Sequence, residues 1–311
     1  MSNCLVTGAA GFIGSTLSER LLAEGHQVTG VDCFVDYYAR DVKEANLTAL
    51  RAHPNFRFYE NNLAHDDLSL IVAGADVVFH EAGQAGVRVS WGASFEGYVT
   101  NNVLATQRLL EAVKTQPLKK FILASSSSVY GDSRDLPLRE TSMPKPVSPY
   151  GVTKLATEHL VNAYHVNFGL PTIALRYFTV YGPRQRPDMG FNRFIRAIAG
   201  GTPIQLYGDG EQTREATYVG DIVQANLLAM QSDANGAVVN VGGGERASVN
   251  HIIGLLEKLI EREAVIKRIE RQAGDVQDTA ADMSHAHEVL GYTPQVALYE
   301  GLRRQVEWQL K

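Results

Sequence analysis

Cysteine is scarce in this chain, and the histidines form no pattern that would make them metal ligands. Only two cysteines occur among 311 residues, Cys4 and Cys33, and they form no CxxC pair or other metal-ligand spacing. The nine histidines are scattered. We therefore expect no metal site, and this sparse cysteine content is typical of a protein of the reducing cytoplasm.

Long apolar runs and a surplus of basic residues are also missing. No continuous apolar span approaches ~18 residues, and the chain does not start with a basic segment followed by an apolar stretch, so we expect no membrane association. With 29 lysines and arginines against 34 aspartates and glutamates, the net charge is −5, which gives no indication of a nucleic-acid partner. Local basic clusters are then candidates for binding a small anion.

The N-terminal segment has the pattern of a dinucleotide-binding unit. A short apolar run, residues 4–7, leads into three glycines spaced Gly-x-x-Gly-x-x-Gly, at Gly8, Gly11 and Gly14, and then into an amphipathic helix through Ala23. Glycines at such a turn let backbone N–H groups approach a pyrophosphate at the helix N-terminus. A second strand, residues 27–32, ends at Asp32, which can accept hydrogen bonds from the adenosine ribose and would repel a 2′-phosphate. This arrangement favours NAD over NADP.

A second pattern lies in the segment from Ser148 to Lys154. Pro149 is placed to begin a helix, on which Tyr150 and Lys154 are four residues apart and share a face. A lysine ammonium beside a phenol favours the phenolate, which makes Tyr150 a candidate general base. Tyr-x-x-x-Lys is also common on ordinary helix surfaces. The four serines of residues 125–128, which directly follow the expected strand 121–124, support the catalytic interpretation, because their hydroxyls are placed to hydrogen-bond a reacting hydroxyl or carbonyl.

Alternating strand and helix patterns predict an α/β fold, a Rossmann-type doubly wound parallel sheet. The further strands are expected at residues 56–60, 77–80 and 172–176, and a helix at residues 101–115. His80, at the end of one strand, is interpreted as a satisfied core histidine. We expect residues 1–180 to form the dinucleotide-binding domain, with later segments returning to it, and residues 181–311 to form mainly a smaller α/β lobe for the substrate.

Together these motifs resemble the extended short-chain dehydrogenases/reductases, in the nucleotide-sugar epimerase/dehydratase group. The resemblance covers nearly the whole chain and also includes Arg176-Tyr177-Phe178, residues 213–221, 271–275 and 290–294. Residues 84–90 and 181–189 are most similar to UDP-glucuronate 4-epimerases. There are departures: Ala216 and Gly220 are unusual for the group, and Glu81 stands where many members have Leu or Ala.

The resemblance implies tightly held NAD and a UDP-sugar substrate, with site residues of three kinds. The catalytic residues it implies are Tyr150, Lys154, Ser126 and Ser127. The NAD-binding residues are Gly8, Gly11, Phe12, Ile13, Gly14, Asp32, Asn62, Leu63, Lys154 and Tyr177. The substrate-binding residues are Arg88, Ser90, Ser128, Thr179, Arg186, Asn192, Arg193, Arg214, Arg271 and Asp275. It also implies a homodimer, with the helices near residues 101–115 and 150–168 at its interface.

The reaction that the resemblance implies is inversion at C4 of UDP-glucuronate through a transient 4-keto sugar, giving UDP-galacturonate. Tyr150 would move the proton of the 4-hydroxyl, and Arg186 would bind the C6 carboxylate. The alternatives are a UDP-glucose/UDP-galactose 4-epimerase, a UDP-glucuronate decarboxylase, a nucleotide-sugar 4,6-dehydratase, or a non-catalytic NAD-sensing module. Ser128 stands where decarboxylases and dehydratases usually carry an acidic residue, which favours inversion over elimination or loss of CO₂.

Overall fold

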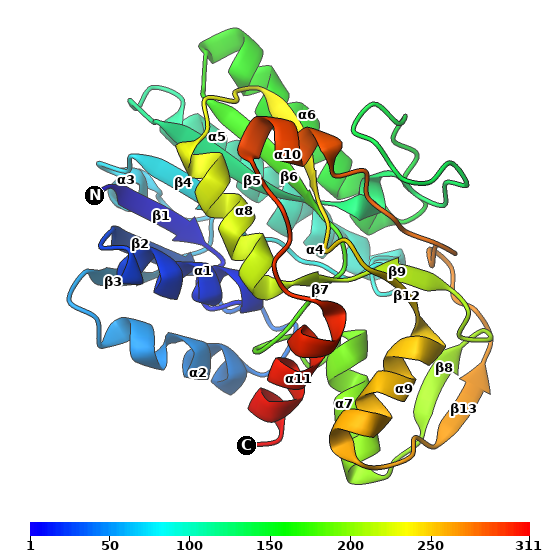
Figure 1. The fold of residues 1–311 in the computed structure, drawn as a ribbon. Coiled ribbons are helices and arrows are strands. Elements are labelled where there is room, and N and C mark those ends of the chain that lie inside the picture. The colour runs from blue at the N-terminus through cyan, green and yellow to red at the C-terminus, as the bar shows by residue number, and fades with distance from the viewer.

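The computed structural model describes residues 1–311 and is built around a seven-stranded sheet (Figure 1). All of its strand pairs are parallel, and the strand order is β11-β6-β5-β4-β1-β2-β3. The strands are β1 (Asn3–Thr7), β2 (Gln27–Asp32), β3 (Phe56–Glu60), β4 (Val77–His80), β5 (Lys120–Ser126), β6 (Thr172–Tyr177) and β11 (Ala237–Val241). The order runs outward in both directions from β1 and β4, so these strands meet at a topological switch point, where such sheets bind ligands. The predicted Rossmann-type fold is confirmed.

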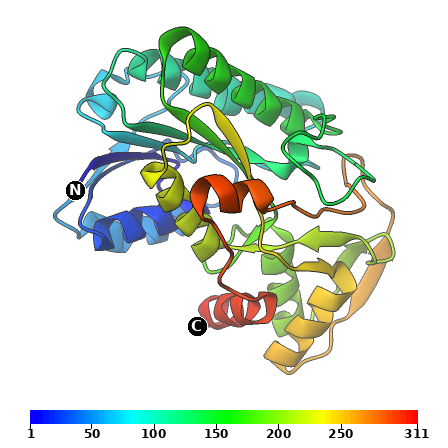
Figure 2. The ribbon, with the colours of Figure 1, turned by 45° about the horizontal axis from the view of Figure 1, so that its top comes forward.

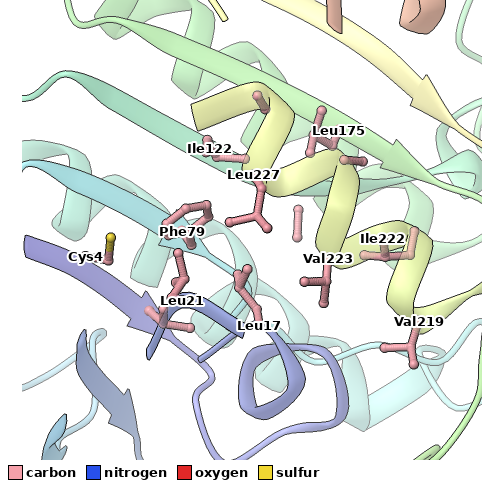
Figure 3. Close-up of a cluster of buried hydrophobic side chains, with 14 of the residues drawn as sticks. Cys4, Leu17, Leu21, Phe79, Ile122, Leu175, Val219, Ile222, Val223 and Leu227 are labelled. Carbon is pink, nitrogen blue, oxygen red and sulfur yellow. The ribbon is translucent and has the colours of Figure 1, made fainter. Parts of the chain in front are cut away.

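Helices cover both faces of the sheet, which explains why its strands are apolar on both sides. Helices α1 (Phe12–Ala23) and α8 (Val219–Gln231) pack on one face, and α5 (Ala105–Val113) and α6 (Pro149–Phe168) pack on the other. Successive side chains of a strand point to opposite faces of the sheet, so each strand contributes to two hydrophobic cores. Cys4 of β1 belongs to the first core, which lies under α1 and α8, and Leu5 belongs to the second, which lies under α5 and α6. In Figure 3, side chains of α1 and α8 point toward strand side chains of the first core.

Two elements differ by more than one residue from the sequence-based expectation. The strand expected at residues 121–124 continues as β5 through Ser126, because Ser125 and Ser126 pair with Arg176 and Tyr177 of β6. The helix expected at residues 101–115 begins earlier. It starts as a short 3-10 turn (Gly92–Ser94) and α4 (Phe95–Tyr98), passes through a π-helical turn (Val99–Leu104), and continues as α5.

The central helix α6 begins and ends as its sequence indicates. The Ser148 hydroxyl caps it by accepting a hydrogen bond from Gly151 N at 3.1 Å, and Pro149 occupies its first turn. Gly169, with φ of 67°, ends it in the left-handed conformation that glycine adopts at little cost. Tyr150 and Lys154 therefore lie in the first two turns of a rigid helix.

A smaller lobe lies beside the sheet and contains the C-terminus (Figures 1 and 2). Its core joins α7 to α9 and α11. Its elements are α7 (Gly190–Gly200), β8 (Ile204–Tyr207), β9 (Thr213–Glu215), β12 (Arg246–Ser248), α9 (Val249–Ile260), β13 (Ile266–Ile269) and α11 (Leu298–Gln309). The pair of β7 (Val180–Tyr181) and β10 (Thr217–Tyr218) is parallel. Because α8, β11 and α10 (Ser284–Leu290) return to the large sheet, the chain crosses between the lobes several times.

The remaining elements are short or peripheral. Helix α2 (Arg40–Arg51) packs against α1, α3 (Ser69–Val72) is one turn long, and Ser127–Val129 form a 3-10 turn after β5. None of the helices combines the length and apolar character that crossing a membrane requires.

Candidate active site

A cavity of about 860 Å³ lies at the carboxyl ends of the central strands. Gly8 lines it after β1, Asp32 at the end of β2, and Ser126 at the end of β5. Arg193 and Tyr207 of the smaller lobe also line it. The cavity therefore draws on both lobes, and its size is that of a site for a small molecule or cofactor.

The glycine-rich turn leaves room for a ligand at the start of α1. Gly8 has φ of 69°, and a Cβ there would lie 2.9 Å from Ala82 Cα. A Cβ on Gly14 would lie 2.3 Å from the Gly8 carbonyl oxygen, so no larger residue fits. Gly11 is the N-cap of α1 and offers no side chain to its first N–H groups. Gly8, Gly11, Phe12, Ile13 and Gly14 all line the cavity, and this geometry fits a pyrophosphate.

Asp32 is fixed beside this turn by two backbone groups. Its Oδ1 accepts a hydrogen bond from Phe34 N at 2.9 Å, and its Oδ2 accepts one from Ala10 N at 3.2 Å. Burial raises the pKa of this carboxyl, and the hydrogen bond from Phe34 and the charge of Lys43 oppose that rise. Asp32, Asn62, Leu63 and Lys43 line the cavity, where Asp32 can receive ribose hydroxyls.

Arg40, the basic residue closest after Asp32, is turned away from this site. It forms ion pairs with Glu44 and Glu60, at 3.1 and 2.6 Å, and it does not line the cavity. Lys43 takes the position on the cavity wall instead, and its Nζ donates to the Val35 carbonyl at 2.7 Å. Both cations lie in the same helix, α2, and the fold decides which of them faces the cavity.

Tyr150, Lys154, Ser126 and Ser127 line one part of the cavity together. Lys154 is buried and its Nζ donates to the Ala124 carbonyl at 2.8 Å, and burial lowers the pKa of its ammonium to about 8. Burial also raises the pKa of the Tyr150 phenol, while the Ser126 hydroxyl and the charge of Arg186 lower it. The sequence argument assigned this acidifying effect to Lys154. In the structure the dominant influence on Tyr150 is burial, and the opposing groups are Ser126 and Arg186.

Asn102, which sequence reasoning did not single out, ties this group to the loop after β4. Its Oδ1 accepts from Gln84 N at 2.7 Å, and its Nδ2 donates to Gln84 O and to Thr153 Oγ1, both at 3.0 Å. It lies in the π-helical turn, a feature that often marks functional sites. A Cβ on Gly83 would lie 3.2 Å from Lys154 Nζ, so the loop, the turn and the lysine are in close contact.

His80 and Tyr177 end β4 and β6, the strands on either side of β5, but differ in their relation to the cavity. His80 is buried, with Nδ1 2.8 Å from Thr7 Oγ1 and Nε2 2.9 Å from Thr106 Oγ1, which fits its interpretation as a satisfied core histidine. Tyr177 lines the cavity, and its hydroxyl donates to Glu81 Oε1 at 2.8 Å.

Two arginines of the cavity lining, both predicted from the sequence to bind substrate, are held by carboxylates. Arg186 Nε and Nη2 donate to the two oxygens of Asp188, at 3.0 and 2.8 Å, and its guanidinium lies 5.2 Å from the ring centre of Tyr37. Arg88 Nη2 lies 2.8 Å from Asp275 Oδ2, and its guanidinium lies 3.8 Å from the Tyr207 ring centre. Such pairs hold a guanidinium in one orientation.

The other substrate-binding residues predicted from the sequence divide into two groups. Ser128, Thr179 and Arg193 line the cavity. Four others lie outside its lining: Ser90, Asn192, Arg214 and Arg271. Ser90 donates to Val87 O, and Asn192 donates to Gln185 O. Arg214 donates to the backbone carbonyls of residues 213, 276 and 277, and Arg271 lies against Gly208. Arg214 thus supports the segment that carries Asp275.

The sequence is similar over almost its full length to known epimerases. Residues 4–242 match the NAD dependent epimerase/dehydratase family. The chain is 43% identical to the Bacillus subtilis (strain 168) protein "Uncharacterized UDP-glucose epimerase YtcB", with 98% of this chain and 96% of that protein covered. It is 39% identical to the UDP-glucuronate 4-epimerase of Thermodesulfobacterium geofontis (strain OPF15), with 99% and 96% covered.

A solved structure agrees with this similarity. The crystal structure of UDP-glucuronic acid 4-epimerase from Bacillus cereus in complex with UDP-glucuronic acid and NAD superimposes with a TM-score of 0.96. The two proteins are 44% identical, and 99% of each chain is covered. The chain belongs to the NAD-dependent epimerase/dehydratase family, and the resemblance inferred from its motifs is confirmed.

Proposed function

We propose that this protein is an NAD-dependent 4-epimerase that converts UDP-glucuronate to UDP-galacturonate. The observation that carries the proposal is the composition of one cavity. The glycine turn with Asp32, the group of Ser126, Tyr150 and Lys154, and the arginine Arg186 all line it. One cavity thus holds groups that are complementary to the dinucleotide, to the reacting sugar and to the acidic substituent of that sugar.

The dinucleotide would occupy the sheet side of the cavity. The N-terminus of α1 and its glycines would hold the pyrophosphate, and Asp32 would accept hydrogen bonds from the adenosine ribose. The other residues proposed to contact NAD are Asn62, Leu63, Lys154 and Tyr177, which also line the cavity. The chemistry that NAD supplies when bound is reversible hydride transfer.

The chain's own residues would manage the proton of the sugar 4-hydroxyl. Tyr150, as its phenolate, takes this proton in the first half-reaction and returns it in the second; the Ser126 hydroxyl and the charge of Arg186 favour the phenolate against the effect of burial. Ser126, with Ser127 as its neighbour, positions the 4-oxygen, and the Lys154 ammonium is held at the Ala124 carbonyl. Arg186, which is proposed to bind the substrate carboxylate, also lowers the pKa of the buried Tyr150 phenol. Substrate placement and proton transfer are therefore coupled through Arg186.

The sugar nucleotide would lie between the sheet and the smaller lobe. Arg186 would bind the C6 carboxylate through Nη1, which makes no hydrogen bond within the chain. Arg193 is a cation on the cavity wall that suits a phosphate, and Arg88 and Asp275 would contact the nucleotide. On this assignment residues 1–180 mainly bind NAD and residues 181–311 mainly bind the substrate.

The experiment that tests the proposal is incubation of purified protein with UDP-glucuronate and, separately, UDP-glucose, with products resolved by NMR. We expect UDP-galacturonate from the first, far slower turnover of the second, and no stoichiometric release of CO₂. Faster turnover of UDP-glucose would favour the UDP-glucose/UDP-galactose alternative, which the name of the Bacillus subtilis relative also suggests. CO₂ release would favour a decarboxylase, and no turnover of either sugar would favour a binding module. The Tyr150→Phe variant is the control for background reaction.

We further propose a cytoplasmic homodimer that acts in nucleotide-sugar metabolism. The support for the dimer is that α6 exposes apolar side chains along its length: Val152, Val166 and Phe168 are 49%, 69% and 54% exposed. Leu104, just before α5, is 40% exposed. The support for the location is that both cysteines are unpaired. Light scattering of the purified protein tests the dimer, and Val166→Glu should shift it toward monomer.

A further inference from the structure

Glu81, directly after β4, is held by a chain of hydrogen bonds from two other elements. The Tyr177 hydroxyl of β6 donates to Glu81 Oε1 at 2.8 Å. This hydroxyl in turn accepts from Nδ2 of Asn226, on α8, at 2.7 Å. Asn226 is fully buried and Tyr177 nearly so. Because Tyr177 has one hydroxyl proton, the arrangement commits that proton to Glu81 and fixes the direction of the carboxyl group.

The other oxygen of this carboxyl is buried and has no hydrogen-bond partner in the chain. Oε2 is one of only four buried side-chain oxygen or nitrogen atoms without a partner. Leaving a buried carboxyl oxygen unpaired is costly, so its retention calls for an explanation. Burial raises the pKa of Glu81 to about 7, and the neighbouring titratable groups are Lys154, whose charge lowers it, and Tyr177.

Glu81 lies between the phosphate turn and the catalytic lysine. A Cβ on Gly8 would lie 3.0 Å from the Glu81 carbonyl carbon, and a Cβ on Gly83 would lie 3.2 Å from Lys154 Nζ. In the sheet, Asp32 of β2 marks the adenosine side and the turn after β1 marks the pyrophosphate. Glu81 follows β4, on the opposite side of β1 from β2. Its position therefore corresponds to the nicotinamide riboside half of a bound dinucleotide.

We propose that Glu81 tunes the bound cofactor: its carboxyl group, fixed in the wall of the cavity beside the nicotinamide riboside half of NAD, stabilises the oxidised, positively charged ring over the reduced, neutral one. A carboxylate several ångströms from the ring attracts NAD⁺ but not NADH, which would shift the ratio of the two forms roughly tenfold. The first half-reaction needs NAD⁺, so this bias keeps the resting protein ready for substrate. The proposal rests on the proposed function only in requiring that NAD binds.

The test is the redox equilibrium of the bound cofactor, measured without any sugar. Full-length protein loaded with NAD is equilibrated with a mediator couple of fixed ratio, and bound NADH is quantified by its absorbance. The measurement is made at about pH 8, above the pKa of about 7 that burial gives Glu81. We expect Glu81→Gln to raise the ratio of bound NADH to NAD⁺ roughly tenfold. Since no sugar takes part, a failed epimerase assay and a failed redox measurement are distinguishable.

Two further variants make the result specific to this charge. Glu263→Gln removes one negative charge from an exposed residue without an ion pair and should leave the ratio unchanged. Glu81→Leu removes the charge without burying an amide, and it replaces Glu81→Gln if that variant does not fold. An unchanged ratio in both folded neutral variants would overturn the proposal, as would equal weakening of NAD⁺ and NADH binding.

The pH dependence gives an independent readout. Reduction of NAD⁺ consumes a proton, so the ratio of NADH to NAD⁺ falls with rising pH in every variant. In the wild type it should fall more steeply through about pH 7, because Glu81 becomes charged. Lys154, with a pKa of about 8, also titrates nearby, and the charge of Glu81 raises that pKa. The difference between the two proteins therefore reports the charge of Glu81 together with its effect on Lys154. A difference that does not change with pH would contradict the charge-based role.

Discussion

Arg186 and Asp188 form a two-pronged ion pair at the cavity wall, with Nε–Oδ1 and Nη2–Oδ2 distances of 3.0 and 2.8 Å. The pair uses one edge of the guanidinium and leaves Nη1 without a partner in the chain. A carboxylate on the substrate can therefore bind without breaking the pair. Asp188 also limits how the guanidinium can turn, and the neighbouring Tyr37 ring supports it from one face.

We expect Arg186→Ala to reduce kcat/KM for UDP-glucuronate by an amount equivalent to about 2–5 kcal/mol, as for breaking a desolvated charge pair. The loss with UDP-glucose should be much smaller, because a neutral hydroxymethyl group cannot pair with the guanidinium. Steady-state kinetics on both sugars measures this. Equal losses on the two substrates would instead place Arg186 at a phosphate, and no loss on either would remove it from the site.

Tyr150→Phe should retain the fold and NAD but lose turnover by about 10²–10⁴-fold, the usual range for removing a positioned acid or base. The phenol ring is buried and packs edge-on against Tyr98, with ring centres 6.1 Å apart, so a phenylalanine ring preserves the packing. Circular dichroism and the NAD content of the purified variant provide the structural controls. Near-normal turnover would eliminate Tyr150 as the proton-transfer group.

The position of Asp32 predicts that NAD binds more tightly than NADP. A 2′-phosphate near this carboxylate would suffer charge repulsion, and two backbone hydrogen bonds hold the carboxylate in place. Asp32→Asn should reduce the preference roughly tenfold or more, since it removes the charge and leaves Lys43 on the cavity wall. Binding titrations with both dinucleotides test this. Equal affinities in the wild type would show that Asp32 does not face the ribose.

Glu81 should make stability decrease with pH in a defined window. Its pKa in the folded chain is raised from 4.5 to about 7, so between these values the unfolded chain has lost the proton that the folded chain still holds. The free energy of unfolding therefore falls across that window, by at most about 3 kcal/mol, and this contribution is constant above about pH 7.

Denaturant unfolding of wild type and Glu81→Gln at a series of pH values measures this contribution. Their difference in unfolding free energy should change from about pH 4.5 to 7 and then level off. Parallel curves across the window would show that the carboxyl is not perturbed in the folded protein. Glu81 raises the pKa of both Lys154 and Tyr177, so the comparison is made below about pH 7, where Lys154 is mainly charged and Tyr177 is neutral in both proteins.

Several local features were predictable because they depend on short segments of sequence. The strands at residues 27–32, 56–60 and 77–80 coincide with β2, β3 and β4, since apolar runs bounded by turn residues specify them. Ser148, Pro149 and Gly169 determine the limits of α6 through capping and backbone preference. The glycine spacing likewise reflects a steric requirement that is local to the first turn.

The sequence by itself thus determined the fold class, the glycine turn and the placement of Tyr150 and Lys154 four residues apart on one helix, because each follows from a local pattern. Only the tertiary structure decided which groups share an environment. It joined Asn102 to Thr153, Asp188 to Arg186, and Glu81 to Tyr177 and Asn226. It also decided that burial dominates the pKa of Tyr150. These contacts join distant segments or depend on desolvation, which arises only when the sheet and its helices close around the cavity.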